Sequence, residues 1–349
     1  MTAETTWQAP AISALDPAVA AAIRAGIDGK AKPRGSLGRI EDLSTQLGMI
    51  AHPSSAKFER AVLLVFAGDH GITEEGVSQY PSTVTAAMVA TYLAGRASAN
   101  AFAAAANVGI RVVDAGVAAE LPAHPGLIRR KIRPGTANSA RQPAMSDREV
   151  SVALTTGHDI AVAEIDAGND ILALGEMGIG NSASSALLAH RLAPAPLDDC
   201  IGMGAGQNEP GMARKRAAIH KAANRSDAQA PIDVMREFGG LEIAMMAGAV
   251  LGAASRRRPV IIDGFICSVA ALAAVRLAPA ARDYCIFAHR SAEKGHQAVL
   301  ASLEAQPLLD LGMRLGEGTG ALLAVPLVRA ASRLLSDVAD LEDVLAGRL

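Results

Sequence analysis

The sequence of 349 residues has few aromatic residues, few cysteines and almost no net charge. Only 3% of its residues are Phe, Trp or Tyr, whereas 50% are hydrophobic, and alanine and small aliphatic residues dominate that half. Because alanine favours helices, this composition predicts many closely packed helices. A formal net charge of −2 gives no electrostatic attraction to nucleic acid or to an anionic membrane surface, so neither is expected as a partner.

Cysteine is scarce as well. Cys200, Cys267 and Cys285 are too far apart to form a CxxC motif or a Cys/His metal site. Each lies in or beside an apolar run, so we expect buried, unreactive thiols in a reducing compartment. The sequence therefore predicts no bound metal.

The sequence also predicts no targeting segment and no membrane-spanning segment. The first 17 residues carry an acidic residue early and no apolar stretch, so no signal peptide is predicted. No stretch approaches the roughly 18 uninterrupted apolar residues of a membrane helix. The densest basic cluster, at residues 256–258, is interpreted as the solvated end of a helix. We expect a cytoplasmic protein that binds no membrane.

The middle of the sequence repeats one pattern, in which a short aliphatic run ends in a Gly-containing polar turn and an Ala/Leu-rich segment follows. The six runs are residues 61–67, 110–113, 171–174, 200–203, 260–262 and 284–287. Short runs without alternation are typical of strands buried on both faces, and helices between them imply parallel strands. The sequence predicts a Rossmann-like α/β fold, with an open parallel sheet of about six strands flanked by helices.

The two ends of the chain follow a helical pattern instead. Apolar residues recur at helical spacing in residues 1–50 and 305–349. These segments predict a small helical domain built from both termini, beside a large α/β domain at residues 51–304. The stretch 118–151 is richer in Pro and Arg and is predicted to be a long excursion from the sheet.

Chemistry is expected beyond the carboxyl ends of the strands, where ligands bind in open parallel sheets. Glycines in the turns let the backbone approach a ligand, and amides at the following helix N-termini are available to a phosphate. Each of these motifs alone is weak evidence for a ligand site. The turn at residues 175–180, for example, lacks the GxGxxG spacing of a dinucleotide-binding loop. Asp69 and His70 have no second histidine at metal-ligand spacing, so we interpret them as structural.

Eight ordered motifs carry a stronger signal. They are KPRGSLG (32–38), FAGDHG (66–71), its continuation through 75–85, GEMGIGN (175–181), GMG (202–204), FGGLE (238–242), DGF (263–265) with HRS (289–291), and LGEGTG (315–320). Together they resemble the nicotinate-nucleotide:dimethylbenzimidazole phosphoribosyltransferases, along almost the whole chain. The resemblance implies a pentosyltransferase of the cobalamin pathway that moves the phosphoribosyl group of nicotinate mononucleotide to 5,6-dimethylbenzimidazole or a related base. It also implies a homodimer and no cofactor.

The same resemblance implies roles for individual residues. Nicotinate on ribose is a pyridinium and leaves readily, whereas the attacking imidazole must lose its N–H proton to a base. Glu317 is the implied general base and Glu176 the second catalytic acid. The implied nucleotide- and phosphate-binding residues are Gly178, Gly180, Asn181, Gly204, Lys215, Asp263 and Ser291. The implied base-binding residues are Tyr80, Met177 and Leu315. Residues 86–88 read Ala-Ala-Met where the family carries a glutamine, which leaves the preferred base open.

Two alternatives stay open at this point. An NAD-dependent oxidoreductase on a doubly wound sheet needs GxGxxG after its first strand, whereas this chain has Gly68-Asp69-His70-Gly71 there. A non-catalytic protein that binds a nucleotide or a base fits the same turns and differs only in turnover. Lys215 also has a second interpretation, as part of a solvated basic run with Arg214 and Arg216.

Overall fold

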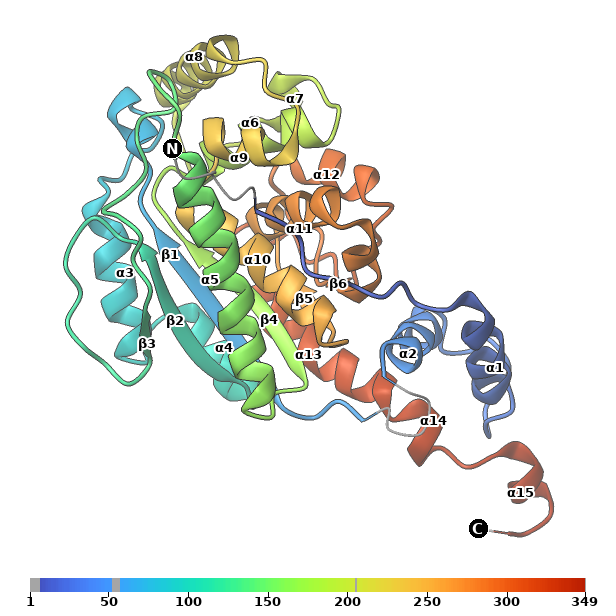
Figure 1. Ribbon diagram of the computed structural model, residues 1–349. Coiled ribbons are helices and arrows are strands. Elements are labelled where there is room, and N and C mark those ends of the chain that lie inside the picture. Colours follow the sequence, from blue (N-terminus) through green and yellow to red (C-terminus); the bar gives the residue numbers. More distant parts are fainter. Residues whose placement is uncertain (1–6, 52–56, 205, 349) are drawn as a thin grey trace.

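One parallel sheet forms the centre of the molecule (Figure 1). The computed structural model describes residues 7–51, 57–204 and 206–348. Within them, six strands lie in the order β3-β2-β1-β4-β5-β6. They are β1 (Ala61–Gly68), β2 (Gly109–Gly116), β3 (Leu127–Arg129), β4 (Ile171–Met177), β5 (Val260–Ile262) and β6 (Cys285–Phe287). All five strand pairs are parallel, so the predicted α/β fold with an open parallel sheet is confirmed.

One predicted strand is wrong, and one strand of the sheet was not predicted. The run at residues 200–203 is not a strand: Cys200 ends the short helix α7 (Leu197–Cys200), and the next residues form an irregular turn. Gly202 interrupts this run after two apolar residues, too few to form a buried strand. The sixth strand is β3, inside the stretch predicted as an excursion, and it pairs only with β2 at the sheet edge. Three residues at an edge carry no periodic signal.

Helices fill the connections. They are α1 (Pro17–Asp28), α2 (Arg39–Ile50), α3 (Thr83–Leu93), α4 (Ser98–Ala106), α5 (Asp147–Asp166), α6 (Asn181–Leu192), α7, α8 (Glu209–Arg225), α9 (Pro231–Phe238), α10 (Leu241–Ser255), α11 (Phe265–Leu277), α12 (His296–Ser302), α13 (Thr319–Ser332), α14 (Leu334–Asp337) and α15 (Leu341–Leu345). Two 3-10 helices are η2 (Gly71–Glu75) and η3 (Pro279–Tyr284).

The local sequence determines where some of these helices begin. At α5, the Ser146 hydroxyl accepts from the Glu149 amide while the Glu149 carboxylate accepts from the Ser146 amide.

The helices cover both faces of the sheet. α10 contacts β1, β2, β4 and β5 on one face and packs against α5 and α11, whereas α3, α4 and α13 lie on the opposite face (Figure 1). The strand order reverses between β1 and β4, since the chain builds outward through β2 and β3 and then returns. A reversal of this kind opens a crevice at the carboxyl ends of the two central strands, which is where open α/β sheets bind ligands.

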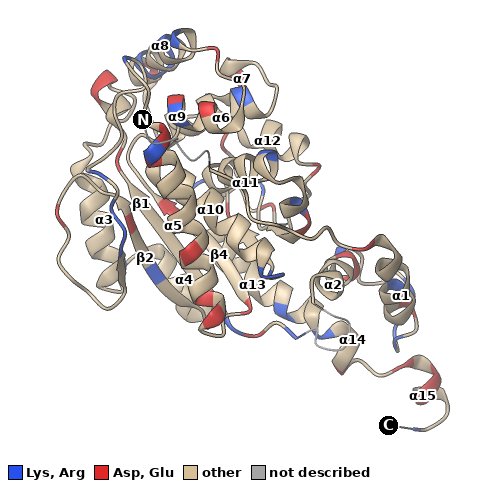
Figure 2. Ribbon diagram, viewed as in Figure 1, with Lys and Arg blue, Asp and Glu red and all other residues tan. Residues whose placement is uncertain are grey.

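Helix α10 is buried because only Glu242 among its residues is charged, and its ribbon is almost entirely tan in Figure 2. It crosses α5 at very short range. A Cβ built on Gly248 would lie 2.0 Å from the carbonyl oxygen of Leu154, and one on Gly157 would lie 1.8 Å from that of Met245. Since these obstacles are backbone atoms, glycine is required at both positions for the two helices to pack this closely.

The two ends of the chain meet away from the cleft. Ile23, Ile27 and Leu334 form a small apolar cluster, apart from the main core that α13 joins. The Ala31 amide donates to the Ala339 carbonyl, and Lys30 Nζ lies 3.1 Å from Asp340 Oδ1. The division into two domains at residues 50 and 305 stays a prediction.

Several sequence expectations about the surface and the thiols are met. Cys200, Cys267 and Cys285 are buried and free. Residues 256–258 follow the last residue of α10, and Arg256 is exposed and pairs with Asp166. No helix in the described part of the chain combines the length and apolar character needed to span a bilayer.

The glycine contact between α5 and α10 gives a stability prediction. We expect Gly248→Ala to lower the free energy of unfolding by about 1–3 kcal/mol, because the added methyl overpacks the helix crossing. Gly109→Ala is the control, since no heavy atom lies within 4 Å of a Cβ there. Chemical denaturation of both variants measures the difference. Equal stability of the two would contradict the assigned role of Gly248.

Candidate active site

A cavity of about 650 Å³ opens at the carboxyl edge of the sheet, beside the β1–β4 reversal. The structure brings all twelve residues singled out from the sequence to its wall. They are Tyr80, Glu176, Met177, Gly178, Gly180, Asn181, Gly204, Lys215, Asp263, Ser291, Leu315 and Glu317. These residues come from strand ends, loops and helices spread over most of the chain, so only the fold places them together. Their individual roles stay predictions.

Glu176, near the end of β4, is a buried carboxylate without a cationic partner among the described residues. It is 6% exposed, and the Asn181 side-chain amide donates a hydrogen bond to it. Gly316 of the facing loop packs against it, since a Cβ there would lie 2.2 Å from Oε1, and its φ of +85° favours glycine. Burial, and then the negative charge of Asp263, raises the pKa of Glu176 to about 8. The group therefore carries a proton for much of the time at neutral pH.

Glu317 stands on the facing loop, two residues before α13. Its backbone adopts a left-handed conformation with φ of +63°, which is unusual for a residue with a side chain. The backbone of the loop packs closely against Gly175 of β4. A Cβ on Gly175 would lie only 2.7 Å from the Glu317 carbonyl carbon, so no larger residue fits there. Local strain of this kind persists only where the surroundings fix it, and it is common at functional sites.

The carboxylate of Glu317 is only partly stabilised. Its Oε2 accepts from the Ala99 amide at 3.4 Å, at the N-terminal end of α4. Burial raises the pKa of Glu317, the Ala99 amide and Tyr92 oppose that shift, and the charge of Asp263 adds to it. Tyr92 is 3% exposed, and burial together with Glu317 and Glu176 raises the pKa of its hydroxyl, which stays protonated.

Asp263 follows β5 and fixes the start of α13. Its Oδ1 accepts from the Ala321 amide at 2.9 Å, and its Oδ2 accepts from the Gly318 amide at 3.3 Å. His289 Nε2 lies 3.7 Å from Oδ1. Both oxygens are therefore engaged by the backbone next to Glu317, while the predicted contact of Asp263 with a nucleotide stays a prediction.

Two cationic side chains also line the cavity. Lys215 is only 1% exposed, and its Nζ donates to the Gly202 carbonyl at 2.9 Å and to Ser182 Oγ at 3.0 Å. Burial lowers the pKa of Lys215. The interpretation of Lys215 as part of a solvated basic run is therefore wrong, because α8 turns this one residue of the run inward. Arg314 Nη1 donates to the Gly204 carbonyl at 3.0 Å and adds a second cation.

The mouth of the cavity is apolar. Tyr80 is 46% exposed and Leu315 is 55% exposed, and Met177, which is half-buried, also lines the cavity. Met88, from the segment that departs from the family pattern, also lines the wall, and Gln79 and Gln207 supply side-chain amides nearby. A flat aromatic ligand fits such a surface, which combines apolar faces with a few polar groups.

His70 lies beneath the cavity and does not line it. Its Nε2 is 2.7 Å from Glu242 Oε1 and its Nδ1 is 3.0 Å from Ser184 Oγ. Burial lowers the pKa of His70, but Glu242 outweighs it, so the net shift is upward. A Cβ on Gly178 would lie 3.4 Å from Nε2, so the ring supports the turn after β4 from below.

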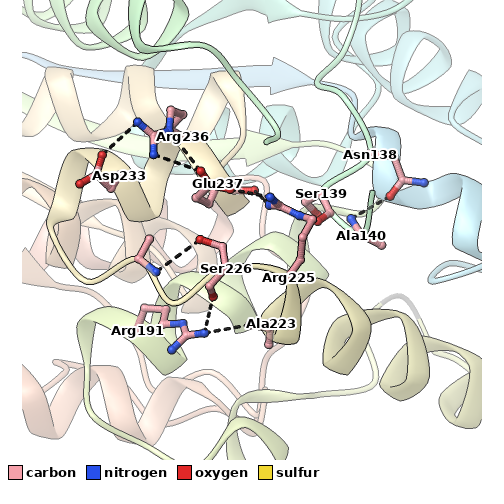
Figure 3. Close-up of polar contacts among 11 residues, drawn as sticks. Asn138, Ser139, Ala140, Arg191, Ala223, Arg225, Ser226, Asp233, Arg236 and Glu237 are labelled. Carbon is pink, nitrogen blue, oxygen red and sulfur yellow. Dashed lines mark hydrogen bonds and ion pairs between the residues drawn. The ribbon is translucent and has the colours of Figure 1, made fainter. Parts of the chain in front are cut away.

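Glu242 is in turn anchored by the segment before it. Arg225 Nη1 donates to Glu237 Oε2 at 2.6 Å and its Nε donates to the Ser139 carbonyl at 2.8 Å (Figure 3). Arg191 and Arg225 both lie over the Phe238 ring, at 5.9 and 5.7 Å from its centroid. These contacts fix the junction of α9 and α10, from which Glu242 reaches His70.

Among the polar residues of the wall that sequence reasoning did not assign to the site are Ser182, Gln207, Glu293 and Arg314. Each lies within a few residues of a recognised motif, so longer motifs would have included them. Tyr92 and Ala99 carried no signal, because they reach Glu317 only through the packing of α3 and α4. Among the described residues, no group of three His, Cys, Asp or Glu side chains is placed to hold a metal.

Comparison with known proteins gives consistent matches. A family described as phosphoribosyltransferase matches residues 12–344. The nicotinate-nucleotide–dimethylbenzimidazole phosphoribosyltransferase of Ralstonia nicotianae is 49% identical over 331 residues, 94% of each chain, and that of Cupriavidus taiwanensis is 46% identical over 333 residues, 95% of this chain and 96% of the relative. The crystal structure of the enzyme of that name from Thermus thermophilus superposes with a TM-score of 0.90, at 41% identity, over 96% of this chain and 99% of that one.

The buried state of Glu176 predicts a pH-dependent effect on stability. Its folded pKa lies above its unfolded value, so the folded protein binds more protons between about pH 4.5 and 8, and stability falls as pH rises through that window. Glu176→Gln removes this dependence. We expect the variant to exceed the wild type in free energy of unfolding by roughly 1–4 kcal/mol at pH 8, with little difference near pH 4.5.

Denaturation curves across this pH range measure the effect. The control is Glu342→Gln, whose side chain is 91% exposed and should leave the pH dependence unchanged. A constant difference between wild type and Glu176→Gln at all pH values would show that Glu176 does not change its protonation on folding.

Proposed function

The chain belongs to the phosphoribosyltransferase family, and from that premise we propose that it transfers the phosphoribosyl group of nicotinate mononucleotide to 5,6-dimethylbenzimidazole or a related base. The products are α-ribazole 5′-phosphate and nicotinate. The reaction belongs to the assembly of the nucleotide loop of cobalamin.

One observation carries the proposal. A single cavity holds two buried carboxylates, Glu176 and Glu317, the buried cation Lys215, and the exposed apolar side chains of Tyr80 and Leu315. A phosphate fits the cation and a flat neutral base fits the apolar side chains. The reacting ribose carbon then lies between them, close to the carboxylates.

The chemical step needs one base. The imidazole nitrogen of the acceptor attacks C1′ of the ribose from the face opposite to nicotinate, the C1′–nicotinate bond breaks, and the acceptor N–H proton must leave. Glu317 takes that proton, because the Ala99 amide favours its ionised form. Glu176 is largely protonated at neutral pH and therefore serves as a hydrogen-bond donor beside the ribose. The remainder of the rate comes from holding two flat reactants in line.

The nucleotide is held at the opposite end of the cavity. Lys215 forms a charge-assisted bond to the phosphate, and the backbone at Gly204 and the turn that opens α6 add amide donors. That turn contains Gly178, Gly180 and Asn181, and Gly180 has a φ of +97° that suits only glycine. Ser291 lies at the same end of the cavity and completes the phosphate site.

Two alternatives from the sequence have less support. The segment after β1 forms the 3-10 helix η2 and lacks the glycine pattern of a dinucleotide-binding loop, which disfavours an oxidoreductase. A protein that only carries a nucleotide or base would use the same cavity without turnover. Release of nicotinate from its mononucleotide in the presence of 5,6-dimethylbenzimidazole, followed by chromatography, separates the enzyme from the carrier.

Two further features complete the proposal. The resemblance to the family supports a homodimer, and buried free thiols suit a protein of the reducing cytoplasm. A screen of acceptor bases by mass spectrometry identifies the preferred one, which the Ala-Ala-Met segment at residues 86–88 leaves open.

The base role of Glu317 predicts a kinetic effect. Glu317→Gln keeps the side-chain shape and removes the proton acceptor, so we expect kcat to fall by about 10²–10⁴-fold while both substrates still bind. Because burial raises the pKa of Glu317, the wild-type rate should fall on acidification as this carboxylate takes up a proton, and that limb should vanish in the variant. Steady-state rates against pH measure both effects. Near-normal turnover by a folded Glu317→Gln would show that another group is the general base.

The phosphate role of Lys215 predicts a separate effect. Lys215→Met fills the buried volume but removes the charge, so KM for the nucleotide should rise by roughly 10- to 150-fold, the range of a charge-assisted hydrogen bond. KM for the base should change little. Lys221→Met on the same helix is the control, because Lys221 is exposed and pairs with Glu75. An unchanged nucleotide KM in Lys215→Met would remove Lys215 from the phosphate site.

A further inference from the structure

Glu293 is an acidic residue at the phosphate end of the cavity, and the proposed reaction gives it no role. It lies between β6 and α12, two residues after Ser291. Its Oε2 is buried and has no hydrogen-bond partner among the described residues. A Cβ on Gly202 would lie 1.9 Å from this oxygen, so the carboxylate is pressed against the turn that accepts from Lys215.

Two cations face Glu293 from other elements. They are Lys215, on α8, and Arg314, in the loop before α13, and both lower its pKa, whereas burial raises it by more. The Gly204 amide is also near the carboxylate. Lys294, the next residue in the chain, points elsewhere: its Nζ lies 3.1 Å from Asp199 and donates to the Asp198 carbonyl.

A phosphate bound to Lys215 changes the charge balance at this end of the cavity. Lys215 and Arg314 carry two positive charges, which a phosphate dianion already neutralises. An ionised Glu293 would then be a buried carboxylate beside an anion, and a like charge within about 4–6 Å disfavours ionisation. A protonated Glu293 removes the repulsion and supplies a donor, and the unpartnered Oε2 is the atom available for the proton.

We propose that Glu293 is a positioning residue that takes up one proton from solvent when the nucleotide phosphate enters the cavity, and then donates a hydrogen bond to that phosphate. The O–H bond forms on Glu293 Oε2, and the proton returns to solvent when the phosphorylated product leaves. This inference rests on the proposed function, because it requires the phosphate at Lys215.

Calorimetry on the whole protein tests the inference. Titration with nicotinate mononucleotide at pH 7.5–8.5, in buffers of different ionisation enthalpy, measures protons taken up on binding. A phosphate monoester has its second pKa near 6, so the ligand stays a dianion in this range. Glu176 also titrates in this range and faces the ribose of both ligands, so the test is the difference between the two ligands. We expect the wild type to take up on the order of one half to one proton more with nicotinate mononucleotide than with nicotinate riboside, which lacks the phosphate.

Glu293→Gln fixes the neutral donor in place. We expect this variant to bind nicotinate mononucleotide more tightly than the wild type at pH 8, by roughly tenfold for each pH unit above the folded pKa of Glu293. The part of the proton uptake that depends on the phosphate should be lost in the variant. The two proteins should bind equally below the folded pKa of Glu293. Asp199→Asn is the control, because Asp199 is an exposed acid on the same side that lies outside the cavity lining, and it should behave as the wild type.

The outcomes are distinct. Loss of proton uptake with tighter binding in Glu293→Gln supports the inference. Equal proton uptake by wild type and variant, or no uptake by the wild type, overturns it while leaving the proposed function intact. Failure of the wild type to bind the nucleotide overturns the proposed function and this inference together, and thermal melting confirms that each variant is folded.

Discussion

The carboxylate of Asp263 holds the loop on which the chemistry depends. It accepts from the amides of Gly318 and Ala321, and so fixes the start of α13 against the end of β5. Glu317, one residue before this contact, stays in a left-handed conformation that it would not keep alone. β4 packs on the other side of the loop through Gly175. The position of the proposed base is therefore set by contacts with β4 and with the residue that follows β5.

This arrangement places three carboxylates, those of Glu176, Glu317 and Asp263, in one buried region where no lysine or arginine of the described chain pairs with them. Burial raises the pKa of all three. Amide donors stabilise them unequally, which fits the proposed roles of Glu176 as the protonated acid and Glu317 as the base. Burying these carboxylates lowers the stability of the folded state, which is common in active sites. Two cations, Lys215 and Arg314, line the same cavity and lie near the acid Glu293.

The sequence predicts some of these features better than others. Strands β1 and β4 are long aliphatic runs buried on both faces, and a local pattern identifies them. β3 has three residues at a sheet edge, and residues 200–203 resemble a strand only until Gly202 interrupts them. The residues of the cavity wall could be named because motifs in a fixed order mark them, whereas periodicity alone predicts only that turns gather at one edge. Tyr92 and Ala99 depend on how α3 and α4 pack, which no local pattern encodes.

Motifs that do not line the cavity have a physical role beneath it. FGGLE at residues 238–242 brings Glu242 to His70, and His70 fills the space under Gly178. Arg225 and Arg191 hold the first residue of that motif through the Phe238 ring. Any side chain at Gly240 would lie 2.4 Å from the His70 ring, so the glycine, the histidine and the glutamate require one another. The proposed phosphate site needs a turn that keeps its shape when no anion is bound, and this buried layer supports the turn from beneath.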